Sequence, residues 1–340
     1  MLLKTIKKIT FVVLLFIIFT ELILRYVFGF CNAPLYLEDP DFEYIYAPNQ
    51  NHFRFRNIVK TNEASMRSEP ISASDTTVIL LIGDSVINGG NPTDHNELAS
   101  TILEKKLTTK LKRKIRVLNI SAGSWGPDNA FAFLKKKGTF DADLICLVAS
   151  SHDAYDNMSF NKIVGIFPNY PNKQYKIAIY EFYDRYWWMV EYSTKSYFEE
   201  FLNWFRNKPM PIQSPKVAQI DTTIASSLST NDIIHKFGTT FNKGFQQLYD
   251  TTTAMKIPFM IYLHPEIVEI EQRRYDKQGL EVIQFANQKK ISMVLELEKH
   301  PNYALLYRDQ VHYNAEGQRY LANQLYPIFV DYLNKTKKTN

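Results

Sequence analysis

One stretch of the chain, residues 77–90, restricts the fold more than any other. Five consecutive apolar residues at 78–82 run directly into Gly83, Asp84 and Ser85. A strand in the middle of a parallel sheet is apolar on both faces, so this unbroken Val/Ile/Leu run predicts a buried parallel strand. Ser85 would then lie at the carboxyl end of that strand, which is the edge of an open α/β sheet where ligands bind.

Two further apolar runs, 115–120 and 143–150, predict strands that also deliver polar or small residues to their ends. A small-residue loop containing Gly123 follows the first run, and a glycine beside a nucleophile lets a backbone N–H face an oxyanion without steric hindrance. The second run leads into His152 and Asp153. Three strand ends are therefore expected to meet at one edge, although a structural histidine bonded to backbone is the alternative for His152.

Near the carboxyl end, Asp309 and His312 lie three residues apart, just before a predicted terminal helix. A serine hydroxyl becomes a nucleophile when a base takes its proton, and the base needs an acid to fix its tautomer. The pair could supply both functions to Ser85 from a single loop. His264, at the end of another predicted strand, is a rival base without an acid at a comparably short spacing.

The rest of the chain alternates in the manner of an α/β protein. The predicted helices are 97–112, 127–137, 231–255, 266–288 and 315–333, and the two later strands are 258–263 and 291–297. Asp94 or Asn96 could cap the first helix and Asn314 the last. The proline-containing segment 32–74 is expected to be extended, with a surface turn at 62–67 whose Arg67 could alternatively contact substrate.

Residues 9–28 form a long apolar stretch preceded by lysines at positions 4, 7 and 8, a flank expected on the cytoplasmic side of a membrane. Glu21 and Arg25 interrupt its end, so the stretch is shorter than an ideal span of about 20 residues, and the two side chains could pair or snorkel. A cleaved signal peptide is the alternative. Residues 28–31 offer neither a small-x-small site nor a lipobox, which favours an uncleaved anchor.

Composition and charge exclude several classes of protein. The 340 residues are 45% apolar, which is typical of a folded chain rather than a disordered one. The net charge of +5 is spread along the chain without a basic stripe, so no nucleic-acid partner is expected. Cys31 and Cys146 are too few and too differently placed for a disulfide framework, so both are interpreted as free. No cofactor or metal is expected.

Residues 155–229 interrupt the alternation with many aromatic residues and several prolines, and are interpreted as an insertion over the sheet edge. Aromatic side chains stack on sugar rings and are also enriched at membrane interfaces. The alternative is a local apolar core.

The chain at this point resembles the SGNH, or GDSL, hydrolase superfamily over roughly residues 78–329. The resemblance rests on the Gly-Asp-Ser turn at 83–85, Gly123, the polar end of the third strand, and the pair Asp309 and His312 before the last helix. It implies a flavodoxin-like three-layer sandwich with a central parallel sheet. It also implies a serine esterase or acyltransferase that needs no cofactor, of the kind found among membrane-anchored, envelope-located bacterial members.

The resemblance also implies catalytic roles, residue by residue. Ser85 would be the nucleophile, His312 the general base and Asp309 the acid that orients it. The oxyanion hole would combine the backbone N–H of Ser85, Gly123 and the residue after the third strand.

At that last position the sequence departs from the superfamily. Where the superfamily has Gly-x-Asn-Asp, residues 150–153 are Ser-Ser-His-Asp, so His152 takes the place of the asparagine. An imidazole N–H can also donate to an oxyanion. Asp84, Asp153 and His264 are further expected substrate contacts.

The expected organisation is a cytoplasmic tip and transmembrane signal anchor at 1–30, a juxtamembrane segment at 31–75, and a hydrolase domain at 76–334 with its insertion at about 155–230. The expected function is an extracytoplasmic esterase, or acyltransferase, acting on O-acyl groups such as O-acetyl of an envelope or extracellular glycan. Expected partners are that glycan, the bilayer and envelope polysaccharide-assembly proteins. The alternative is a catalytically weak glycan-binding or assembly protein that uses the same cleft.

Overall fold

The computed structural model describes residues 2–72, 74–187, 190, 194, 238–299 and 305–336. Its centre is a parallel sheet of five strands in the order β6-β5-β7-β8-β9. These strands are β5 (Thr77–Gly83), β6 (Ile115–Ser121), β7 (Leu144–Ser150), β8 (Phe259–His264) and β9 (Ser292–Leu295). In sequence order this is the flavodoxin-like arrangement, which confirms the predicted fold class.

Strand β5 owes its apolar sequence to its central position. It pairs in parallel with β6 on one side and with β7 on the other, so that Ile79 lies between Val117 and Leu144. All seven of its residues are buried. Side chains on both faces therefore meet the core, and the usual polar alternation of a half-exposed strand is absent.

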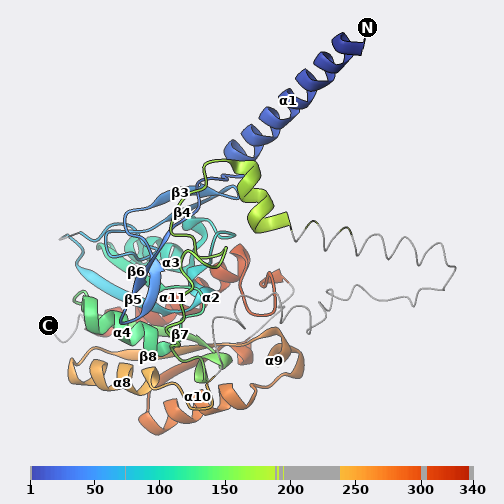
Figure 1. Ribbon diagram of the computed structural model, residues 1–340. Coiled ribbons are helices and arrows are strands. Elements are labelled where there is room, and N and C mark those ends of the chain that lie inside the picture. The colour runs from blue at the N-terminus through green and yellow to red at the C-terminus, as the bar shows by residue number, and fades with distance from the viewer. Residues whose placement is uncertain are drawn as a thin grey trace.

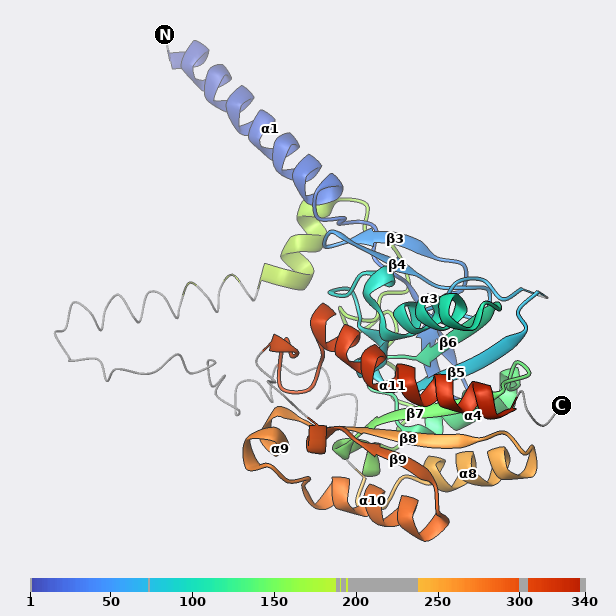
Figure 2. The same ribbon diagram turned by 180° about the vertical axis from the view of Figure 1, so that it is seen from behind.

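Helices cover both faces of the sheet and make three layers (Figures 1 and 2). The helices α3 (Ala99–Leu111) and α11 (Ala315–Thr336) bury Leu103 and Phe329 against one face. The helices α4 (Pro127–Lys137), α8 (Gly244–Ala254) and α10 (Lys277–Lys289) bury Phe133, Phe245 and Val282 against the other. The helix at 127–137 has the predicted bounds, and Asn314 accepts from Gly317 N (3.0 Å) at the start of α11, as expected of its cap.

The first predicted helix begins later than expected. Asp94 accepts a hydrogen bond from the backbone N–H of Asn96, and so caps the short 3-10 helix η1 (His95–Glu97) rather than a long helix. Leu98 is extended, and α3 begins only at Ala99, whose N–H is satisfied by the side chain of Gln318 (3.0 Å). A contact from a residue over 200 positions away thus replaces the local cap.

The predicted helix 266–288 is two helices, α9 (Ile267–Gln272) and α10. Arg273 has a left-handed backbone (φ 54°), which ends α9. Asp276 then caps α10 by accepting from Gly279 N. Similarly, α8 begins at Gly244 rather than near 231, and residues 231–237 of that prediction lie outside the described residues.

The segment 32–74 is not simply extended. It forms two antiparallel hairpins, β1 (Tyr36–Asp39) with β2 (Glu43–Tyr46), and β3 (Asn51–Arg54) with β4 (Asn57–Lys60). Each strand has four residues, and β2 is buried at every position, so no alternating pattern marks it in the sequence. Both cysteines are free, as predicted.

Helix α1 (Leu2–Tyr26) projects away from the rest of the chain (Figure 1). Residues Leu3–Tyr26 are long and apolar enough to cross a membrane, with a mean hydropathy of 2.2, and the most apolar window is not buried by the protein. A signal sequence has the same length and composition. Glu21 and Arg25 form the predicted ion pair at 2.7 Å.

Candidate active site

Ser85 is the first residue of the short helix α2 (Ser85–Asn88), directly after β5. The carboxylate of Asp84 accepts from Val86 N at 2.8 Å and fixes the turn. A Cβ on Gly83 would lie 2.5 Å from the carbonyl oxygen of Val148, so only glycine lets the end of β5 approach β7 this closely. The turn therefore delivers the serine side chain to the carboxyl edge of the sheet.

The structure brings Ser85, His312 and Asp309 together. His312 Nε2 lies 2.8 Å from Ser85 Oγ, and His312 Nδ1 lies 2.9 Å from each carboxylate oxygen of Asp309. Burial opposes ionisation of Asp309, but hydrogen bonds from the His312 side chain and from two backbone N–H groups hold its pKa well below the usual range. Asp309 therefore stays ionised and favours the tautomer of His312 that leaves Nε2 free to accept the serine proton.

Arg67 and Arg308 donate hydrogen bonds to backbone carbonyl oxygens of the loop 88–90, which follows Ser85. The guanidinium of Arg67 is fully buried and donates to the carbonyl oxygens of Asn88 (2.6 Å) and Gly90 (2.7 Å). Arg308 donates to the Gly89 carbonyl (2.9 Å) and so joins the loop carrying Asp309 to the loop carrying Ser85. Residues 63–65 form a turn, in line with the turn predicted at 62–67, but Arg67 is buried and its guanidinium donates to backbone carbonyl oxygens. The expectation that Arg67 lies at the surface or contacts substrate is therefore wrong.

His264 is fully buried behind this site. Its Nδ1 lies 3.0 Å from a carboxylate oxygen of Glu296, and its Nε2 lies 2.7 Å from the carbonyl oxygen of Val311. Both neighbours offer acceptor oxygens, an environment that favours a ring protonated on both nitrogens. Burial opposes this charge, yet the Glu296 carboxylate raises the pKa of His264. His264 therefore neither faces a substrate nor reaches Ser85 as a base, contrary to both sequence-based expectations.

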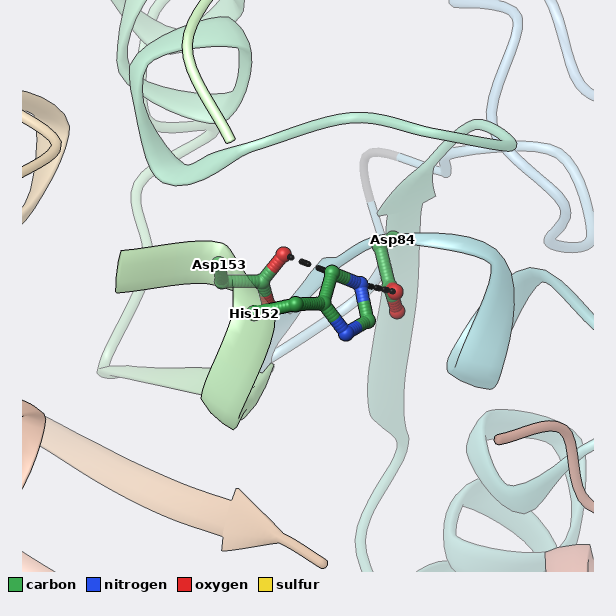
Figure 3. A group of neighbouring side chains, drawn as sticks. All are labelled: Asp84, His152 and Asp153. Carbon is green, nitrogen blue, oxygen red and sulfur yellow. Dashed lines mark ion pairs between the residues drawn. The ribbon is translucent and has the colours of Figure 1, made fainter. Parts of the chain in front are cut away.

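His152 comes from the 3-10 helix η2 (Ser151–Ala154), at the end of β7. Its Nδ1 lies 3.0 Å from Glu266 Oε1, and its Nε2 is 3.8 Å from a carboxylate oxygen of Asp84 and of Asp153. Figure 3 shows the ring reaching between these two carboxylates. Asp84 in turn lies 3.5 Å from Ser85 Oγ, so His152 is one residue removed from the serine, with a side chain that is 24% exposed.

The carboxylates around His152 decide its charge. Burial opposes protonation, but the hydrogen bond to Glu266 and the charges of Asp153 and Asp84 raise the pKa of His152 well above its usual range. Burial and the neighbouring Asp84 raise the pKa of Asp153. His152 Nδ1 faces the Glu266 carboxylate and so carries a proton, and a second proton on Nε2 would make the ring a donor on both sides. The three side chains in Figure 3 have donor atoms within 4.8 Å of one another, a spacing that could hold a metal ion.

Gly123 follows β6 at the same edge, and its carbonyl accepts from Tyr44 Oη at 2.8 Å. The side chain of Asn88 donates to the Ser121 carbonyl (3.0 Å) and ties the serine turn to the end of β6. The oxyanion roles of Gly123 and His152 stay predictions. Glu266 and Glu296, which hold the two histidines, were not predicted, because they lie 114 and 32 residues from their partners and no local pattern joins them.

No family model and no curated relative matches the chain. Solved structures that resemble it include TesA (13% identity, 75% of this chain, 99% of that chain, TM-score 0.43). A lipase/acylhydrolase from Enterococcus faecalis has 9% identity over 74% of this chain and 94% of its own, with a TM-score of 0.40. A variant of Axe2, an acetyl xylan esterase from Geobacillus stearothermophilus, has 14% identity over 73% and 92%, with a TM-score of 0.36. At these sequence identities and TM-scores, the likeness concerns the fold and is no evidence for a particular reaction. Any reaction has to be inferred from the geometry of the site.

Proposed function

We propose that this chain is a serine esterase of the SGNH type, with Ser85, His312 and Asp309 as its catalytic triad. One observation carries the proposal: His312 lies 2.8 Å from the serine oxygen through Nε2 and 2.9 Å from the Asp309 carboxylate through Nδ1. A base within hydrogen-bond reach of a nucleophile, itself oriented by an acid, is the arrangement that activates a serine hydroxyl.

The acylation step follows from these positions. Ser85 Oγ attacks the carbonyl carbon of an ester while His312 Nε2 takes the hydroxyl proton, and Asp309 stabilises the imidazolium that forms. The charge that develops on the carbonyl oxygen needs hydrogen-bond donors, and we assign the Ser85 N–H, Gly123 and the protonated His152 to that task. The carbon–oxygen bond to the alcohol then breaks, the alcohol leaves with the proton from His312, and the acyl group stays on Ser85.

Deacylation repeats the sequence with a second hydroxyl. His312 takes a proton from water, or from an acceptor sugar, whose oxygen attacks the acyl-serine. The acyl–serine bond breaks and His312 returns its proton to Ser85 Oγ. Hydrolysis and acyl transfer thus use the same residues and differ only in which hydroxyl reaches the acyl-enzyme.

We propose an O-acyl group, such as O-acetyl, on an envelope glycan as the substrate, and a position outside the cytoplasm. The aromatic residues Tyr192, Tyr197, Phe198 and Trp204 of the insertion support a sugar ligand, since aromatic rings stack on sugars. The lysines at positions 4, 7 and 8 before α1 support a cytoplasmic amino terminus.

The residues that follow the apolar stretch support an anchor that is not cleaved. Phe30 is buried, and the carbonyl oxygen of Gly29 accepts from the buried guanidinium of Arg54 (2.8 Å). The N–H of Cys31 donates to the carboxylate of Glu181. Cleavage within 28–31 would remove contacts of the folded domain, whereas an ordinary signal peptide is released without such a loss.

A glycan-binding or assembly protein that uses the same cleft is the second candidate. The observation that favours it is His152, which stands where the superfamily pattern has the asparagine of the oxyanion hole. Binding needs no activated serine, so reactivity at Ser85 separates the two functions.

The test is hydrolysis of p-nitrophenyl acetate, and release of acetate from an O-acetylated polysaccharide, by the full chain in detergent. Ser85→Ala should lower kcat by about four orders of magnitude or more, since loss of a triad nucleophile typically costs that much. The exposed Ser74→Ala is the matched control and should leave kcat unchanged. Equal activity of the wild type and Ser85→Ala would refute the proposed esterase.

A further inference from the structure

The end of α1 is bonded to one segment of the domain. The carboxylate of Glu21 accepts from the backbone N–H groups of Ala178 (2.8 Å) and Ile179 (2.9 Å), and so caps the helix at 178–187 from outside its own chain segment. Arg25 donates to the carbonyl oxygen of Lys176 at 2.7 Å. In Figure 1 this helix, yellow-green, lies directly beside the lower end of α1. The depth of Glu21 in a membrane therefore sets the depth of residues 176–179.

One face of the helix 178–187 is fixed on the domain. Glu181 is fully buried and accepts from Arg54 (2.6 Å) and Arg185 (2.9 Å), while Ala178 is buried beside it. These positions follow the three- and four-residue spacing of a single helix face. The segment is thus held rigidly, and its other face must point away from the domain.

That outward face exposes Tyr180, Tyr183 and Trp187, together with Asp184, whose carboxylate accepts from Tyr175 Oη. Two further apolar side chains, Ile166 and Ile177, are exposed in the segment before the helix, and these five apolar and aromatic residues are each between 43% and 64% accessible. The basic side chains of Lys173 and Lys176 are exposed next to them. A surface of tyrosine, tryptophan and isoleucine beside lysine has the composition of proteins at the lipid headgroup level, where aromatic rings find both apolar and polar surroundings.

The length of the apolar stretch brings this surface to the bilayer. Between Lys8 and Glu21 there are 12 residues (9–20), all within α1. At about 1.5 Å per residue they span about 18 Å, against a hydrocarbon thickness of about 30 Å. Lysine side chains can snorkel at the cytoplasmic end, but the shortfall also draws Glu21 towards the bilayer. Residues 176–179, which are hydrogen-bonded to Glu21 and Arg25, are then drawn towards the bilayer with them.

We propose that residues 166–187 form a membrane-contact surface, in which the five exposed apolar and aromatic side chains sit in the headgroup region of the bilayer crossed by α1. This inference rests on the proposed anchor. It assigns α1 and the surface a joint role: a single helix would leave the domain free to tilt, whereas a second contact fixes its orientation above the membrane.

The test uses the full chain with Cys31→Ser, in vesicles of phosphatidylethanolamine and phosphatidylglycerol. Cys146 is fully buried in the sheet and stays in place. Tyr183→Cys, Val13→Cys or Leu280→Cys is labelled with an environment-sensitive fluorophore. Quenching is measured with lipids spin-labelled near the headgroup for Tyr183 and Leu280, and with lipids spin-labelled deep in the acyl chain for Val13, which lies in the middle of the stretch 9–20. Leu280 on α10 is the matched control, because it is 56% exposed against 61% for Tyr183 and belongs to a helix that Figure 1 shows far from α1.

The proposal predicts that quenching at Tyr183 reaches at least half of that at Val13, while Leu280 stays near the value without spin label. Quenching at Val13 with Tyr183 no different from Leu280 would overturn the membrane-contact surface and leave the anchor standing, as expected if a protein partner covers the face instead. Absence of quenching at Val13 would overturn both the anchor and the surface. Activity towards p-nitrophenyl acetate in the same vesicles reports the proposed esterase independently.

Discussion

His264 Nε2 lies 2.7 Å from the carbonyl oxygen of Val311, the residue directly before His312. Through this bond the buried His264 ring, which also contacts Glu296, holds the loop that presents His312 to Ser85. The rings of Tyr307 and Tyr313 pack on His264 at centroid distances of 5.2 and 4.4 Å. His264, which lies outside the proposed triad, thus positions His312, which belongs to it.

We therefore expect His264→Leu to lower kcat more than it changes KM, because the loop shifts and a displacement of about 1 Å in a catalytic group can cost about a hundredfold. Breaking a buried pair by removing one partner typically costs about 3 to 5 kcal/mol of stability. Steady-state kinetics and denaturant unfolding of the full chain in detergent measure the two effects.

The double variant His264→Leu with Glu296→Leu is the control, and it should be more stable than His264→Leu alone because no uncompensated charge remains. The raised pKa of His264 also determines the direction of the pH dependence of stability. The contact between His264 and Glu296 stabilises the fold fully below pH 6.5, the ordinary pKa of histidine, and this stabilisation is lost as the pH rises through the pKa of His264 in the folded state. If His264→Leu alone kept the stability and kcat of the wild type, the hydrogen bond to Val311 would have no positioning role.

His95 should give the opposite pH dependence. It is buried next to the Glu69 carboxylate (3.1 Å), and burial together with the charge of Arg67 lowers its pKa from 6.5 to about 4. Its neutral form is therefore fully stabilising above pH 6.5, and about 3 kcal/mol is lost as the pH falls from 6.5 to 4, at about 1.36 kcal/mol for each pKa unit.

In His95→Gln the side chain cannot titrate, so the fall in unfolding free energy between pH 7 and pH 4 should be smaller by about that amount. Denaturant unfolding at the two pH values measures the difference. If the free energy of unfolding fell by the same amount in the wild type and in His95→Gln, the group responsible for the acid sensitivity would be another residue.

His152 is the point where the site departs from the superfamily's pattern. If its protonated Nε2 donates to the oxyanion, His152→Ala should lower kcat by about a hundred- to a thousandfold with little change in KM. His152→Asn should recover much of that loss, because an amide N–H donates from a similar position.

Glu266→Gln should lower kcat less than His152→Ala does, since it weakens the partner of Nδ1 (3.0 Å) and leaves the ring in place. A change confined to KM would make His152 a substrate contact. If His152→Ala and His152→Asn lowered the melting temperature equally and left kcat unchanged, the role of His152 would be structural.

The anchor makes a prediction about topology. In spheroplasts of a Gram-negative host, protease added outside should digest the domain and leave a small membrane fragment containing α1, because the lysines before the span stay in the cytoplasm. An amino-terminal epitope tag should remain on the full-length chain. Digestion only after lysis would reverse the topology, and a soluble form without the tag would demonstrate cleavage.

The sequence predicted the sheet because its central strands are unbroken apolar runs, and it predicted Ser85, Gly123 and His152 at the edge because each follows such a run. Asp309 and His312 were instead identified by their spacing before the last helix. Contacts across the chain were not predictable in the same way. Arg67 acts on a loop 21 to 26 residues away, and Glu21 caps a helix over 150 residues away. The four-residue strands of the hairpins carry no periodicity, and a single left-handed residue, Arg273, divides a pattern that otherwise predicts one helix.

The proposed esterase requires an activated Ser85, which covalent labelling by a fluorophosphonate detects. Peptide mass spectrometry of the labelled full chain should find one adduct, on the peptide containing Ser85. The adduct should be absent from Ser85→Ala and form far more slowly in His312→Ala, whereas the control variant Asp331→Asn, at an exposed position, should label like the wild type. An adduct on another residue, or equal labelling rates in His312→Ala and the wild type, would contradict the account.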